Sequence, residues 1–118
     1  MNELDLKNLV YPEFEDICSA YYRITTSNGD MWSIPVWTIM LNRAEYYAKI
    51  DDIPIDESLN EDTIPLFNDD NDEIEDWARS NMNWEDVQDV AEFLQRAADK
   101  GSIDYQEEWC NPEEVEIL

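Results

Sequence analysis

A chain of 118 residues is long enough for one domain of ordinary size, so we expect a single acidic domain over residues 1–118. Apolar residues make up 43% of the chain and aromatic residues 12%, which excludes a disordered acidic tail and predicts a folded core. Thirty Asp and Glu against seven Lys and Arg give a formal net charge of −23. Such a surface repels nucleic acids and anionic membranes and attracts basic partners.

The cysteines and the N-terminal residues bear on the cell compartment. Residues 1–9 include Glu3 and Asp5 and lack the apolar core of a signal peptide. We therefore expect Cys18 and Cys110 to be reduced thiols in a cytoplasm. No apolar run approaches the ~20 residues that span a bilayer.

The first clear pattern is a β-hairpin. Tyr21–Thr26 is rich in aromatic and β-branched residues, and Asn28-Gly29 is a strong two-residue turn signal. Met31–Val36 is then the returning strand. Pro35 has no backbone donor and belongs at the end of this strand or on a sheet edge.

The pattern then changes from strand to helix. Apolar residues recur at steps of three and four from Trp37 to Ile50, which predicts a helix. Residues 51–72 contain many Asp and Glu together with Pro54 and Pro65, and we interpret this stretch as an acidic loop.

Two further helices are expected. Glu73–Ser80 predicts a short helix with Ile74, Trp77 and Ala78 inward, capped by Asn71 or Asp72. Trp84–Lys100 predicts a long amphipathic helix, with Asn83 and Asp86 as a capping box and Gly101 at its end.

The C-terminal residues alternate again. Ile103–Leu118 predicts a second hairpin, with a turn at Asn111-Pro112 and a last strand over residues 113–118. The predicted fold class is α+β, with an N-terminal β-hairpin, about three helices and a C-terminal β-hairpin.

The composition argues against catalysis, cofactors and designed metal sites. The chain has no His, and Gly29 and Gly101 are its only glycines, which removes phosphate-binding loops and dinucleotide-binding signatures. Residues 68–73 resemble the start of a calcium loop. Glu73 and Arg79 stand where that loop requires Gly and Glu, so we expect no metal site and no enzyme.

The charge itself is the main functional signal. A rigid array of carboxylates offers Lys and Arg the same target as a phosphate backbone, because Arg pairs bidentately with either group. We expect an acidic ridge that binds a partner, with Trp109 as an exposed aromatic anchor beside it. The ridge residues are Asp69, Asp70, Asp72, Glu73, Glu75, Asp76, Glu85, Asp86, Asp89, Glu92, Glu107, Glu108, Glu113, Glu114 and Glu116.

Other readings of the same charge stay open. Each acidic group also fits a solvated face, and the net charge fits adaptation to high salt. A carboxylate-dependent hydrolase is a third reading, but any Asp–Glu pair is expected by chance among thirty carboxylates, so such a pair is no evidence for catalysis. An acidic adaptor or antitoxin-like protein would bind a basic partner outside its nucleic-acid site.

Segments of the chain are similar to small uncharacterised phage and prophage proteins; they are residues 34–36, 42–48 and 77–84. In charge, size and lack of catalytic groups the chain resembles the small DNA-mimic inhibitors that bacteriophages encode. This resemblance implies a stoichiometric inhibitor acting in the bacterial cytoplasm as a monomer or homodimer. Its implied partner is a basic nucleic-acid-binding host protein, either a CRISPR effector or a restriction nuclease.

Overall fold

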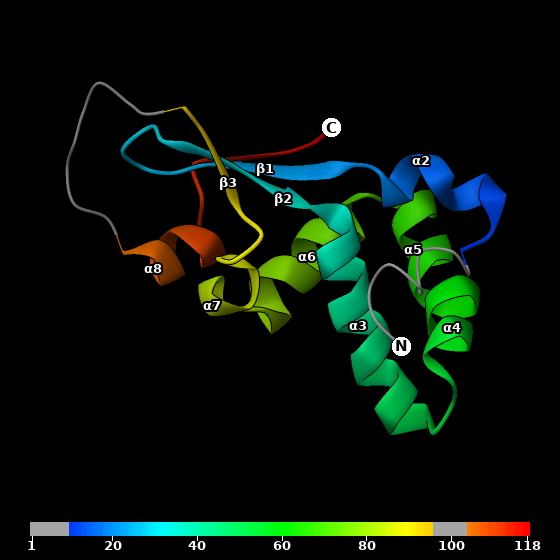
Figure 1. Ribbon diagram of the computed structural model, residues 1–118. Coiled ribbons are helices and arrows are strands. Elements are labelled where there is room, and N and C mark those ends of the chain that lie inside the picture. Colours follow the sequence, from blue (N-terminus) through cyan, green and yellow to red (C-terminus); the bar gives the residue numbers. More distant parts are fainter. Residues whose placement is uncertain (1–9, 96–103) are drawn as a thin grey trace.

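The computed structural model describes residues 10–95 and 104–118, and these form an α+β domain built on one antiparallel sheet. The strands are β1 (Tyr21–Thr25), β2 (Met31–Pro35), β3 (Glu92–Gln95) and β4 (Glu114–Ile117). Their order across the sheet is β3-β2-β1-β4. The helices that follow the first hairpin lie on one side of the sheet, and no described helix covers the other side (Figure 1).

The N-terminal hairpin is confirmed. A short 3-10 turn (Pro12–Phe14) and helix α2 (Glu15–Cys18) lead into β1, which pairs with β2. Gly29 adopts a left-handed φ of 90°, as its place in the tight turn requires. Pro35 lies at the end of β2 and immediately precedes the next helix, where its missing donor is tolerated.

Strand alternation separates the two faces of the sheet. Tyr22, Ile24 and Ile34 are fully buried and face the helices. The register places Arg23 opposite Ser33 on one side and opposite Glu116 on the other, so these three residues share the uncovered face.

The predicted helix over residues 37–50 is confirmed as α3 (Val36–Asp51). It buries one face, including Trp37, Met40 and Ala44, against the core. The helix ends at Asp52, whose φ of 53° is left-handed and whose N–H donates to the carbonyl of Ala48. Asp tolerates this conformation better than most residues do.

The predicted acidic loop over residues 51–72 is wrong. The chain there is helical through α4 (Ile55–Ser58), a π turn (Leu59–Thr63) and α5 (Ile64–Asp69). Leu59, Thr63 and Phe67 are buried at four-residue spacing, a helical period that the surrounding carboxylates and prolines obscure. In the π turn the N–H of Ile64 donates to the carbonyl of Leu59. Pro65 stands in the first turn of α5, where its missing N–H is tolerated.

The short predicted helix is confirmed as α6 (Asp72–Asn81), with its predicted inward residues buried. The capping box of Asn83 and Asp86 is also confirmed. The long helix that it was expected to start is wrong, because α7 ends after one turn (Trp84–Val87).

Residues 92–95 instead form β3, which pairs with β2. This pairing satisfies the backbone of β2 and places Phe93 against Trp32, with ring centroids 4.9 Å apart. Tertiary pairing therefore overrides the helical period. Residues Arg96–Lys100 of the predicted helix and its Gly101 lie outside the described residues.

The predicted C-terminal hairpin is wrong in its first half. Residues 105–110 form helix α8 (Tyr105–Cys110), whose N-cap Asp104 accepts from the N–H groups of Gln106 and Glu107 at 3.0 and 3.3 Å. The last strand is confirmed as β4, but it pairs with β1. The described chain thus contains more helices than the three expected, and Ile103 lies outside it.

The two cysteines lie in different environments. Cys18 is buried and its Sγ lies 3.9 Å from the Sδ of Met40, whereas Cys110 is half-buried at the end of α8. None of the helices in the described ranges has the length and apolarity needed to cross a bilayer.

A substitution at Leu59 tests whether residues 51–72 pack as helices. Because Leu59 is fully buried, Leu59→Ala should lower the free energy of unfolding by about 2–5 kcal/mol in urea denaturation. Ile50→Ala removes an apolar residue that is 58% exposed and should change it by less than about 0.5 kcal/mol. Equal effects would contradict the packing described here.

Candidate acidic interaction surface

The first acidic group lies on one continuous surface at the junction of α5 and α6. We call it the α5–α6 acidic face; its residues are Asp69, Asp70, Asp72, Glu73, Glu75 and Asp76. Asp69 ends α5, and the Oδ1 of Asp70 accepts from the N–H of Asp72 at 3.0 Å, which ties the two helices together. Asp72, Glu73, Glu75 and Asp76 line one groove, and Asp69 and Asp70 precede them at the end of α5.

Helical periodicity fixes how this face is presented. Ile74, Trp77 and Ala78 are buried on the inner side of α6, and the Nε1 of Trp77 donates to the Oδ1 of Asn42 on α3 at 2.9 Å. The carboxylates of α6 occupy the opposite side of the same helix. Their backbone is therefore held in place by the core.

A groove of about 740 Å³ runs along this side of α6. Carboxylates of α6 line one wall, and Cys110 and Asn111, at the end of α8, line the other. Arg79 bridges the two walls, since its Nε donates to the carbonyl of Cys110 at 2.8 Å and its Nη1 lies 3.6 Å from Glu75.

Most of the charge on this face is uncompensated. Within the described ranges, Glu75 is the one residue of the α5–α6 acidic face with a Lys or Arg nitrogen within 4.0 Å. Asp69, Asp70, Asp72 and Asp76 are exposed. The groove therefore attracts cationic groups.

The hydroxyl of Tyr22 lies beneath this region, in electrostatic reach of Glu75 and Arg79. Burial raises the pKa of Tyr22, Glu75 raises it further, and Arg79 acts in the opposite direction. Among the described residues its hydroxyl has no hydrogen-bond partner. The phenol therefore stays neutral and adds no charge to the face.

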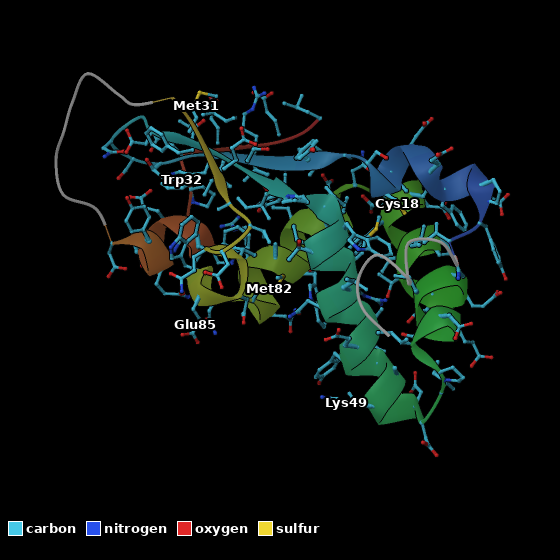
Figure 2. The ribbon with its side chains drawn as sticks, in the orientation of Figure 1. Cys18, Met31, Trp32, Lys49, Met82 and Glu85 are labelled. Atoms are coloured by element: carbon cyan, nitrogen blue, oxygen red, sulfur yellow. The ribbon has the colours of Figure 1, made fainter. Side chains whose placement is uncertain are left out.

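The second acidic group is spread over three elements: Glu85 and Asp86 lie on α7, Asp89 in the turn after it, and Glu92 on β3. Glu85 lies on the side of α7 that points away from the sheet (Figure 2). Asp86 accepts from the N–H of Asn83 at 2.8 Å and serves the capping box. Asp89 is exposed in the turn that follows, and Glu92 starts β3.

The third group does not join the first. Glu116 lies opposite Arg23, and Glu92 lies opposite Ser33, on the uncovered face of the sheet. Glu114 shares that face, and Glu113 precedes β4. The predicted ridge is therefore two acidic surfaces on opposite sides of the sheet.

Glu108 does not face a partner, which corrects its predicted role. Its side chain is 7% exposed and accepts from the N–H of Ser27 at 2.8 Å and from the Ser27 hydroxyl. It thereby anchors the turn of the N-terminal hairpin to α8. Glu107 points outward, and its Oε1 accepts from the Nδ2 of Asn111 at 3.4 Å.

Trp109 is not an exposed anchor. It is fully buried, and its Nε1 donates to the carbonyls of Ala78 and Met82 at 2.8 and 3.1 Å. A helix leaves its last carbonyls without internal partners, and this indole bonds to one of them, Ala78, and to Met82 just after the end of α6. Its ring lies 5.5 Å from that of Tyr22.

One exposed aromatic surface lies instead in a cluster that the sequence did not single out. We call it the aromatic patch; its residues are Trp32, Trp84, Phe93 and Tyr105. They come from four separate elements, and Trp32 points from β2 toward the helices (Figure 2). These residues are far apart in the sequence, so no local pattern predicts that they form a cluster.

Neither the arrangement of potential metal ligands nor comparison with known proteins points to a further site. In the part of the chain that the structure describes, no three Cys, Asp or Glu side chains converge as metal ligands would. The chain matches no protein-family model, and comparison with curated proteins and with solved structures gives no match.

Neighbouring residues on α8 allow a matched test of the structural role of Glu108. Glu108→Ala should lower the free energy of unfolding by about 1.5–3 kcal/mol, because two hydrogen bonds to a carboxylate are lost. Glu107→Ala should change it by less than about 0.5 kcal/mol. Thermal unfolding followed by circular dichroism measures both, and a larger loss in the Glu107 variant would contradict the assignment.

Proposed function

We propose that this protein is a non-enzymatic, stoichiometric inhibitor that occupies the nucleic-acid site of a basic host protein. The α5–α6 acidic face stands in for the phosphate backbone. The resemblance to phage-encoded inhibitors favours a CRISPR effector or a restriction nuclease as the target. The observation that carries the proposal is the largely uncompensated carboxylate array on an ordered helix.

The spacing of these carboxylates supports the mimicry. Side chains three or four residues apart on a helix lie about 5–6 Å apart. In α6 this sequence spacing separates Asp72 from both Glu75 and Asp76, and Glu73 from Asp76. A DNA strand carries one charge per ~3.4 Å of axis. The two arrays are similar enough in density for one set of Lys and Arg side chains to pair with either.

Rigidity supports it further. The buried side of α6 and the bridge from Arg79 to Cys110 hold the groove without help from a partner. A preorganised array loses less conformational entropy on binding than a disordered acidic tail would. The proposal therefore rests on charge placed on a fixed scaffold.

Affinity capture from a nuclease-treated bacterial lysate, read by mass spectrometry, tests the face directly. One variant neutralises exposed carboxylates of the α5–α6 acidic face: Asp69→Asn, Asp70→Asn, Asp72→Asn and Asp76→Asn. The amide oxygen keeps an acceptor at position 70. This variant should retain at least tenfold less of a nucleic-acid-binding protein at moderate salt, a loss of about 1.4 kcal/mol.

The matched control neutralises as many exposed carboxylates at the far end of α3 and in α4: Asp51→Asn, Asp52→Asn, Asp56→Asn and Glu57→Gln. It changes the net charge equally and should leave capture within about twofold. Equal losses in both variants would mean that net charge alone drives capture, and no loss in the first would place binding elsewhere.

A further inference from the structure

The aromatic patch is a contiguous surface of stacked and edge-on rings. Trp84 and Tyr105 stack at 5.2 Å with an interplanar angle of 17°. Trp32 meets Trp84 and Tyr105 edge-on at 5.3 and 5.8 Å, and Phe93 at 4.9 Å. Hydrogen bonds fix the stack, because Gln106 accepts from the N–H of Trp84 at 2.8 Å and donates to Asn83 at 3.0 Å.

The rings of this patch reach solvent. Tyr105 is 40% exposed and Phe93 is 39% exposed, while Trp32 and Trp84 are half-buried beneath them. Apolar side chains gathered in this way mark an interaction surface more often than scattered ones do.

The surroundings of the patch are acidic. Between Trp84 and Gln95 the chain has carboxylates and no Lys or Arg, and the same holds for α8. Asp104, the N-cap of α8, directly precedes Tyr105 and is exposed, whereas Glu92 points to the opposite side of β3 from Phe93. The patch therefore combines accessible π faces with a negative field.

We propose that the aromatic patch is a second docking surface and that its occupant is an arginine-presenting segment of the protein partner. The inference rests on the proposed function, because it concerns the same basic partner. A planar guanidinium stacks on aromatic rings and pairs with nearby carboxylates, whereas an ammonium group does so less well. The exposed face of Tyr105, backed by Trp84, is the central contact.

Charge complementarity selects this occupant over the alternatives. Aromatic surfaces also stack nucleic-acid bases, but phosphates would meet Asp104 and the net charge of −23. A second copy of this chain would bring the same carboxylates against each other. A basic protein segment gains from both the rings and the field.

Oligoarginine and oligolysine peptides of equal length are the probes, and isothermal titration calorimetry gives their dissociation constants. The wild-type chain should bind oligoarginine about two- to fivefold more tightly than oligolysine, the ratio expected for exposed cation–π contacts. Tyr105→Ala should abolish this preference, and Tyr105→Phe should keep it. A single-stranded oligonucleotide should bind more weakly than either peptide.

The control is Tyr21→Ala, which removes a tyrosine of similar exposure from the uncovered face of the sheet. It should leave the arginine preference unchanged. An equal affinity for the two peptides in the wild-type chain, loss of the preference in Tyr21→Ala, or tighter binding of the oligonucleotide would each overturn the inference. The neutralised α5–α6 variant should keep the preference, so this outcome separates failure of the patch from failure of the proposed function.

Discussion

The indole of Trp109 connects helix α8 to the sheet and to helix α6, and the arrangement of these three elements depends on it. Its ring packs against Tyr22 of the sheet. Its N–H donates to the carbonyl of Ala78, in the last turn of α6, and to that of Met82, just after the helix. This contact sets α6 against α8, and the groove between them follows from it. The acidic side of α6 faces outward because its other side is buried in this core.

Of the cations in the described ranges, Arg43 and Arg79 form ion pairs and hydrogen bonds that join elements of the structure. Arg43 lies over the Tyr47 ring at 4.6 Å and pairs with Asp62 at 3.2 Å, where it joins α3 to the π turn. Arg79 links α6 to the end of α8. On the α5–α6 acidic face Arg79 pairs with Glu75 alone, so the other carboxylates of that face keep their charge and the negative field reaches solvent.

The sequence predicted correctly those elements whose conformation depends on neighbouring residues in the chain. The turn at Gly29 and the short helix α6 are examples. The errors arose where distant residues decide: β3 forms because β2 offers a pairing edge, and Glu108 is buried because Ser27 lies above α8. The spacing of Asp104 and Glu107 was a capping signal for α8 that the alternating pattern concealed. The aromatic patch has no local signal at all.

If the acidic surface mimics nucleic acid, the two compete for one site on the partner. An equilibrium competition, in which duplex DNA is titrated into the purified complex of this protein with its captured partner, measures this. DNA should displace the protein completely, and both complexes should weaken steeply as salt rises. A ternary complex, in which the partner holds DNA and this protein together, would contradict mimicry and identify an acidic adaptor instead.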